Sequence, residues 1–303
     1  MNGPKHFVAT DEFGVERLSG EPVRWAVPSN GEATISLTRP DHRPLVLREP
    51  FALLDLLDEV IWIAEPVDDV AEGPAEGEVT ARSARLVRRT AWDATAAARF
   101  AIDCAEHGIG RAGEVQLPNG QTIADVLVAA RAFLDSATDP DAHLGLLARI
   151  GTVRRLKREN RLVGDLAYGL SIEDISNELD TTLDVAWTSA ASVADSLFAA
   201  LEALRHLALP RYVRAREGAA IEQGTHGSDD PVQRNIFTTP WGPITIGGDH
   251  ESPYLPAAVA ARDAALRARE ATRDRDGAEA ERAERQWQAA QLAALLAVPT
   301  NPS

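Results

Sequence analysis

The chain has 303 residues, of which 45% are hydrophobic and 25% charged, so it is long enough to bury one large core or two smaller ones. Its 46 acidic and 31 basic residues leave a formal net charge of -15, which repels phosphate backbones and anionic membranes and argues against both as ligands. The same charge attracts basic partners, although keeping the protein soluble is the simpler explanation for it.

Cys104 is the single cysteine, which excludes an internal disulfide and a zinc site built from several cysteines. Residues 1–7 lack the basic region and apolar core of a secretory signal. No stretch approaches the roughly 18 consecutive apolar residues that a membrane span needs. We therefore expect a cytoplasmic protein in a reducing compartment.

Residues 1–66 are predicted to form a small β meander followed by a helix. Three β-rich segments separated by turn residues predict short strands, at residues 22–27, 33–38 and 44–48. From Glu49 to Glu65 apolar residues recur at helical spacing, and Pro50 suits a first helical turn. The acidic run over residues 67–83, which carries glycine and proline, is interpreted as a linker.

Residues 84–210 are predicted to form a helical bundle, because alanine is abundant and apolar residues recur every three or four positions. Helices are expected at residues 88–108, 122–137, 141–159 and 171–209. Their apolar stripes, which include Phe100 and Phe133, are interpreted as core. Cys104 lies in one of these stripes and has the setting of an inert buried thiol.

Residues 211–255 are predicted to form a loop and a β-hairpin inserted into this bundle. Residues 236–246 contain two short β-rich runs around a Pro-Trp-Gly-Pro turn. Aromatic anchors and an acidic rim are typical of protein interfaces, so we take as candidate partner-binding residues Phe237, Trp241, Asp229 and Asp230. The alternative is that Trp241 folds onto the bundle and only stabilises the insertion.

Residues 256–303 are predicted to form a long helix, interrupted at Gly277, that packs back on the bundle. Its apolar end carries Trp287 and Leu292, which we expect to pack against the helices that contain Phe100 and Phe133. The predicted fold class is therefore mainly α, an Ala-rich helical bundle with a small N-terminal β element and a β-hairpin insertion.

Two short strings resemble the manganese motifs of the arginase and agmatinase ureohydrolases. They are Gly247–His250 and Asp141–His143, but they occur in the reverse order, and no Asp-rich third motif follows them. We therefore expect no metal and no cofactor. A metal-dependent enzyme remains an alternative, with candidate ligands on both sides of the hairpin at His226, Asp229, Asp249 and His250.

Residues 169–186 resemble the helix-turn-helix of bacterial response regulators in the spacing of their apolar side chains. The candidate recognition helix carries Asp180 and Asp184 and has no Arg or Lys for phosphate or guanine. A regulator is thus an alternative, and nucleic acid is not the expected partner. The chain has no nucleophile-elbow, Walker or Rossmann motif, so no catalytic residue is assigned and a non-enzymatic role is expected.

Three segments, in this order, resemble the helical immunity proteins associated with bacterial polymorphic toxins. They are Ala97–His107, with its Asp-Cys-Ala-Glu run, Ala129–Phe133, and Glu284–Leu292, with its Trp-Gln pair. The resemblance implies an antitoxin-like protein whose acidic surface binds a basic, toxin-like protein. It also implies that Asp103, Glu106 and Trp287 pack and cap helices rather than contact a toxin.

Overall fold

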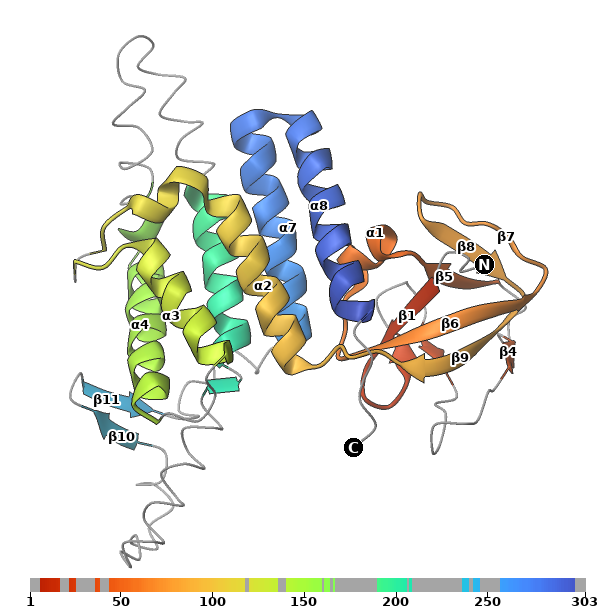
Figure 1. Cartoon of the computed structure of the whole chain (residues 1–303), viewed down its shortest axis with the longest axis horizontal. Helices are drawn as coiled ribbons and strands as arrows, with labels where there is room; N and C mark the ends of the chain where they lie inside the picture. Colours follow the sequence, from red (N-terminus) through yellow and green to blue (C-terminus); the bar gives the residue numbers. More distant parts are fainter. Residues whose placement is uncertain are drawn as a thin grey trace, which may run out of the picture.

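The structure is a computed structural model of the chain, in which an antiparallel sheet and a helical bundle lie side by side (Figure 1). It describes residues 6–16, 22–25, 36–38, 44–117, 120–135, 140–159, 161–163, 166, 190–205, 207–208, 236–239, 242–245 and 257–297. Within this part of the chain, no helix is both long enough and apolar enough to cross a membrane.

The N-terminal part forms a seven-stranded antiparallel sheet with the strand order β4-β9-β6-β1-β5-β8-β7. Its strands are β1 (His6–Thr10), β4 (Ser36–Thr38), β5 (Leu45–Arg48), β6 (Val60–Asp68), β7 (Ala71–Glu72), β8 (Glu78–Ala81) and β9 (Ser83–Arg89). A separate two-stranded hairpin is formed by β2 (Val15–Glu16) and β3 (Val23–Arg24). The longest strand, β6, pairs with β1 and β9, so it lies inside the sheet.

The central strands of the sheet are buried on both faces. Because successive side chains of a strand point to opposite faces, Val8 and Trp62 enter a small core with Trp25 of the β2–β3 hairpin. Phe7 and Ile61 belong instead to the main core, which continues into the helical bundle. The sheet is thus a layer between two cores and a main part of the fold.

The expectation of a mainly α fold is wrong, because the sheet makes this a mixed α/β protein. The helix expected from Glu49 to Glu65 consists only of α1 (Pro50–Leu53) and the short 3-10 helix η1 (Leu54–Leu56). The chain then enters β6, whose run Val60-Ile-Trp-Ile-Ala is rich in β-branched and aromatic residues that favour strands. The supposed linker at residues 67–83 contains β7 and β8, and residues 83–89, expected as part of the bundle, form β9.

Residues 171–189 of the helix expected at 171–209 lie outside the described part of the chain. The helices that the structure describes follow the sheet where periodicity predicts them, except that the first begins at Ala94 and not at Arg88. They are α2 (Ala94–Ile109), the short η2 (Gly110–Glu114), α3 (Ile123–Asp135), α4 (Pro140–Arg158), residues 190–205 and 207–208, α7 (Ala257–Asp276) and α8 (Ala278–Ala297). The side chain of Asp93 caps α2 by accepting a hydrogen bond from the amide of Ala96 at 2.8 Å. Gly277, with φ at +89°, separates α7 from α8 where the interruption was predicted.

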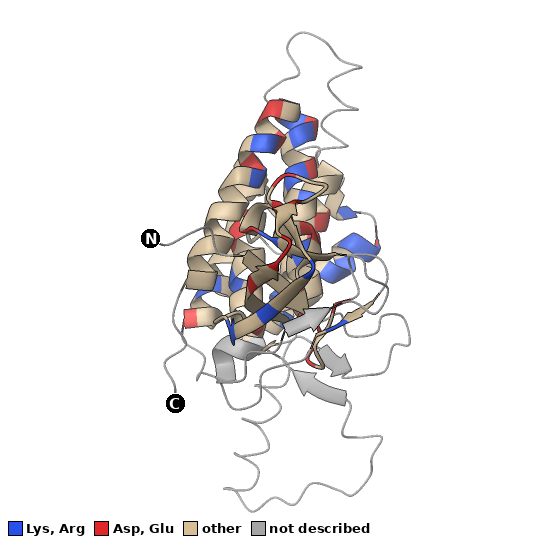
Figure 2. Ribbon diagram, turned by 90° about the vertical axis from the view of Figure 1, so that its right-hand side faces the viewer, with Lys and Arg blue, Asp and Glu red and all other residues tan. Residues whose placement is uncertain are grey.

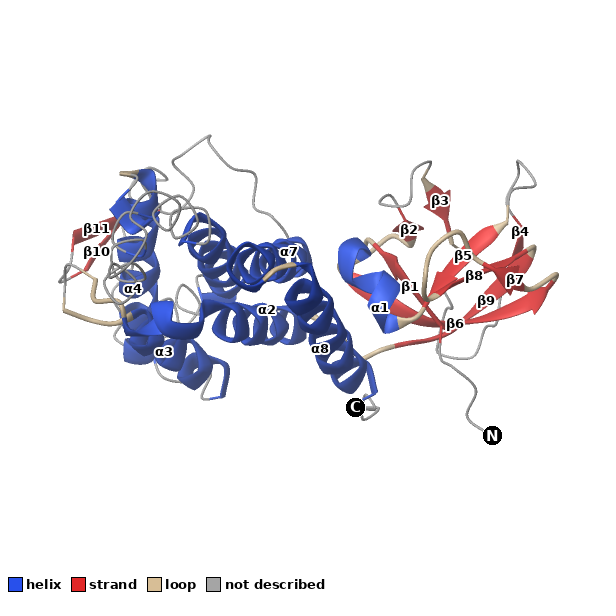
Figure 3. Cartoon of the chain, turned by 90° about the horizontal axis from the view of Figure 1, so that it is seen from above, coloured by secondary structure: helices blue, strands red, loops and turns tan. Residues whose placement is uncertain are grey.

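Small side chains bring α2 and α7 close together. A Cβ added at Gly108 would lie 2.9 Å from the Cβ of Ala268, so only glycine fits at this crossing. α8 packs on α7 and also contacts α1 and η1, so it lies between the bundle and the sheet (Figure 3). The terminal helix therefore joins the two parts of the molecule.

Candidate functional site

The candidate residues of the insertion fall largely outside the described part of the chain. The predicted hairpin is formed by β10 (Ile236–Thr239) and β11 (Gly242–Thr245), with Phe237 opposite Ile244. The side chain of Phe237 is not described, and the other candidates lie outside the described residues, namely Trp241, Asp229, Asp230, His226, Asp249 and His250. Their roles in partner or metal binding stay predictions.

The apolar residues singled out in the bundle are buried in the main core, among them Phe100, Cys104, Phe133 and Leu292. Phe100 meets the ring of Trp92 edge-on, with centroids 6.1 Å apart. Burial, reinforced by the negative charges of Glu284 and Asp103, raises the pKa of the Cys104 thiol well above its usual value. The thiol therefore stays protonated and inert, as expected of a packing residue.

The acidic pair of the family-like segment holds α3 against α2. Nη2 of Arg131 on α3 lies 2.8 Å from Oδ1 of Asp103, and its Nε donates a hydrogen bond to Glu106 at 2.8 Å. Burial raises the pKa of Asp103, and the neighbouring guanidinium of Arg131 offsets only part of that rise. Both carboxylates are engaged within the molecule, in the helix-packing role that the resemblance implies.

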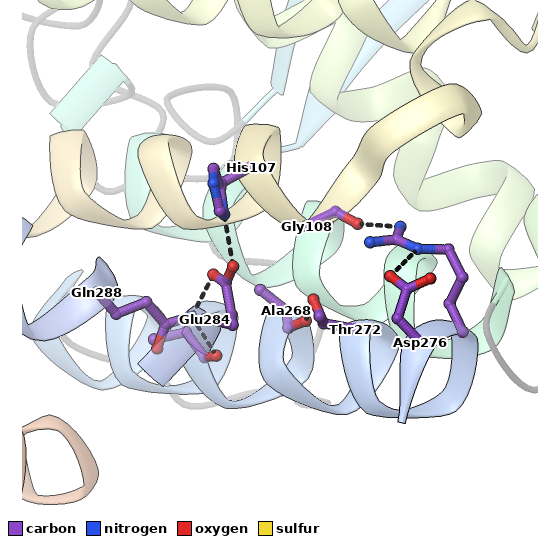
Figure 4. Close-up of polar contacts among 9 residues, drawn as sticks. His107, Gly108, Ala268, Thr272, Asp276, Glu284 and Gln288 are labelled. Carbon is purple, nitrogen blue, oxygen red and sulfur yellow. Dashed lines mark hydrogen bonds and ion pairs between the residues drawn. The ribbon is translucent and has the colours of Figure 1, made fainter. Parts of the chain in front are cut away.

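A polar contact that periodicity did not predict crosses the three helices α2, α7 and α8 (Figure 4). Nδ1 of His107 on α2 lies 2.5 Å from Oε2 of the buried Glu284, and its ring stacks on Trp287 of α8. Nε2 of Gln288 donates to the other oxygen of Glu284 and to the carbonyl of Ala265 on α7, both at 2.9 Å. The four-residue spacing of Glu284 and Gln288 could have indicated that both lie on one helix face.

As predicted, Trp287 docks on α2, the helix that carries Phe100, and Leu292 is completely buried in the main core. The main contacts of α8 are with α7, α1, η1 and α2, so most of its docking surface is not the α3 helix that carries Phe133. The terminal helix thus packs against the sheet side of the bundle.

Asp55 joins the sheet part to the bundle. Its two carboxylate oxygens accept hydrogen bonds from Arg269 of α7 at 2.5 Å and from Arg285 of α8 at 2.7 Å. The Arg285 guanidinium also lies 4.6 Å from the ring centre of Phe51. Burial alone would raise the pKa of Asp55, but the hydrogen bonds and charges of the two arginines outweigh it and lower that pKa.

A pocket of about 260 Å³ opens between the β2–β3 hairpin, β5 and β8, and we term it the sheet pocket. Its lining includes the charged residues Glu16, Arg48 and Glu78 and the apolar residues Val23, Leu56 and Pro74. Arg48 is only 3% exposed, and its Nη1 and Nε lie 2.8 Å from Glu16 and 3.2 Å from Glu78. Among the lining residues that the structure describes, two carboxylates face one guanidinium, which gives this part of the pocket an excess negative charge.

Three further glutamates lie within two residues of the lining residues Arg48 and Pro74 in the chain, and together with Glu78 we term Glu49, Glu72 and Glu76 the acidic edge. Glu72 and Glu76 are exposed in β7 and the following turn, on either side of Pro74. Their side chains make no ion pair with any residue that the structure describes. Glu49, at the N-cap position of α1, makes none either, although its charge raises the pKa of His6 against the larger lowering by burial. Figure 2 looks onto the sheet end of the molecule and shows acidic residues on its loops.

The sequence contained the charge of the acidic edge but not its position. The acidic composition of residues 67–83 predicts a linker. In the structure, the pairing of β5 with β8 places Glu78 of this segment opposite Arg48. Glu16 reaches the same place from another hairpin, 32 residues away from Arg48 in the chain. Such a site depends on strand pairing and has no local motif.

No protein-family model, curated protein or solved structure matches the chain. Its function is therefore proposed from its own residues.

Proposed function

We propose that the protein is a non-enzymatic, immunity-like binding protein whose partner is a basic, toxin-like protein domain. The observation that supports this most directly is the acidic edge, where the exposed carboxylates of Glu72 and Glu76 have no ion-pair partner among the described residues and lie on either side of Pro74, which lines the sheet pocket. Such a surface speeds the encounter with a cationic partner and disfavours acidic ones.

Basic residues of the sheet part offset some of this charge. Arg24, next to Val23 on β3, is exposed, whereas Arg82 and Arg85 form exposed pairs with Asp69 and with Glu65 of the neighbouring strand β6. Arg48 is the basic residue of the sheet pocket, and it is shared by Glu16 and Glu78. The described lining of the pocket thus has the same sign of charge as the whole chain, whose formal net charge is -15.

The family-like segments fit this proposal in a supporting role. Asp103, Glu106 and Trp287 are engaged in contacts between helices, which leaves partner binding to other surfaces of the molecule. We place this function in the cytoplasm, where the single cysteine, Cys104, would stay reduced. No described residue favours the helix-turn-helix or metal-enzyme alternatives, because residues 169–186 and the four candidate metal ligands lie outside the described part, namely His226, Asp229, Asp249 and His250.

The test is a titration of the purified protein with the product of the neighbouring gene whose sequence is basic. We expect saturable 1:1 binding at physiological salt that weakens as salt is raised, because the contact is between opposite charges. Hen egg-white lysozyme serves as an unrelated basic control and should not bind. Absence of binding by the neighbouring product, or equal binding of lysozyme, would contradict the proposal.

A further inference from the structure

We infer that the sheet pocket receives a lysine or arginine side chain of the basic partner, with Glu78 as its main contact. This inference rests on the proposed function and deepens it by assigning one anchoring site on the acidic edge. Interfaces commonly depend on a few such anchors, each filling a pocket on the other protein.

The size of the pocket fits a single side chain. Pockets that enclose a drug-sized ligand usually measure roughly 300–1,000 Å³, and the sheet pocket, at about 260 Å³, is smaller. It is also open to the surface next to Pro74, at the acidic edge. A side chain carried on a partner surface can therefore enter it without any movement of the described strands.

The lining matches the two parts of a long basic side chain. Val23, Leu56 and Pro74 offer apolar surface for the methylene stem, which such side chains bury while their charged end finds a polar group. Among the lining residues that the structure describes, Glu16 and Glu78 supply two negative charges against the one positive charge of Arg48. A second cation therefore gains from the excess charge, and an anion would be repelled by it.

The carboxylates are held in place before any ligand arrives. Glu16 is fixed at both oxygens, by Arg48 at 2.8 Å and by the indole Nε1 of Trp25 at 3.1 Å. Glu78 uses Oε1 for Arg48, and its Oε2 has no hydrogen-bond partner among the described residues. With a side chain 12% exposed, against 6% for Glu16, Glu78 is the carboxylate better placed to accept an incoming ammonium or guanidinium.

Stability alone does not explain why Glu16, Arg48 and Glu78 are largely buried as charged groups. Well-packed apolar residues often stabilise a core as much as a buried ion pair does, because desolvating the charges offsets their attraction. Here the three charged groups line an open pocket instead of a closed core, so they remain available to a ligand.

Trp25 provides a direct reporter for the test, since its indole donates to Glu16. The ¹H–¹⁵N signal of this indole, assigned with Trp25→Phe, is followed while N-acetyl-arginine amide or N-acetyl-lysine amide is added to the full-length protein. N-acetyl-citrulline amide has nearly the same shape as the arginine probe without its charge and serves as the control. We expect a saturable shift with the cationic probes and none with citrulline.

Two variants test the pocket itself. Glu78→Gln should lower the affinity for the arginine probe roughly tenfold, because the change removes a charge-assisted hydrogen bond. Val23→Trp should abolish binding by filling the pocket while leaving every charge in place. Glu65→Gln, which alters an exposed pair elsewhere on the sheet, is the matched control and should bind as the wild type does.

An unsaturable shift, an equal shift with citrulline, or unchanged binding by both Glu78→Gln and Val23→Trp would overturn the inference. Its failure is separable from failure of the proposed function. If the basic gene product binds wild type and both variants equally, the protein-binding role stands and the pocket is not its anchor. If the arginine probe binds but the gene product does not, the pocket stands as a cation site and the proposed partner is wrong.

Discussion

The imidazole of His107 lies face to face with the indole of Trp287, with ring centroids 3.9 Å apart and planes inclined by 6°. The same imidazole is held by the buried carboxylate of Glu284, one turn before the stacked tryptophan. Stacking and hydrogen bonding from neighbouring turns of α8 thus fix how this helix lies on α2. This contact joins two segments that resemble the immunity family, 177 residues apart in the chain.

Replacing Trp287 by alanine should therefore destabilise the protein. The change removes the stacked ring and leaves space between α2 and α8, so we expect a loss of about 2–3 kcal/mol in the free energy of unfolding. Gln286→Ala changes an exposed residue next to it and should alter stability by less than about 0.5 kcal/mol. Urea unfolding followed by circular dichroism compares the two, and equal stabilities would contradict the docking role of Trp287.

Gly108→Ala should destabilise the crossing of α2 and α7, because the new methyl group would lie 2.9 Å from the Cβ of Ala268. We expect a loss of about 1–3 kcal/mol, typical of an overpacked core. In Gly151→Ala, on an open face of α4, the new methyl group meets nothing within 4 Å. The higher helix propensity of alanine should then raise the free energy of unfolding by up to about 1 kcal/mol. Thermal melts should move in opposite directions, and Ala268→Gly should restore part of the loss at Gly108.

Asp55→Asn should weaken the joint between the sheet and the bundle in a pH-dependent way. The pKa of Asp55 is lowered in the folded protein, so its charge stabilises the fold fully above the unfolded pKa and less as the pH falls through the folded pKa. We expect a loss of about 1–2 kcal/mol near pH 7, allowing for solvent screening at this half-exposed carboxylate. The difference from wild type should hold down to about pH 5 and shrink below about pH 4.

Asp135→Asn is the control for this series, since it breaks an exposed pair with Arg99 and should cost less than about 1 kcal/mol. Denaturant unfolding at pH 7, 5 and 3 measures both variants. A difference for Asp55→Asn that grows as the pH falls would contradict the assigned direction of the pKa shift.

Cys104 should react with thiol reagents only when the protein opens. Its side chain is fully buried and its raised pKa keeps the thiol protonated, so the native protein at pH 8 should react at least about 100-fold more slowly than the protein in urea. Because Cys104 is the single cysteine, the coloured thiolate that a chromogenic disulfide reagent releases on reaction with a thiol reports on Cys104 alone. Rapid reaction of the folded protein would show that α2 is not packed as described.

The helices could be predicted from the sequence because their signals are local. The apolar stripes of α3, α4 and α8 repeat within a few turns, and Gly277 interrupts the terminal helix where glycine alone readily adopts a positive φ. The docking of Trp287 followed from the same periodicity. Its partner His107 did not, because a stacking partner on another helix leaves no mark in the local pattern.

The sheet could not be predicted in the same way, because its pairing is between distant residues. Phe7 lies opposite Ile63 in the register of β1 and β6, and the run from Val60 to Ala64 is buried on both faces. A strand covered on both sides shows no alternation of polar and apolar residues. The leucines before it, at helical spacing, therefore predict a helix where the structure has a strand.

The sequence by itself therefore determined that the chain is acidic, that its one cysteine is an inert packing residue, and that its amphipathic helical segments need a common core. Tertiary structure alone decided that Glu16, Arg48 and Glu78 meet in one pocket, and that Pro74, between the exposed Glu72 and Glu76, lines it. The reason is physical, since helix formation depends on neighbours three and four residues apart, whereas strand pairing brings together residues whose separation the chain does not specify.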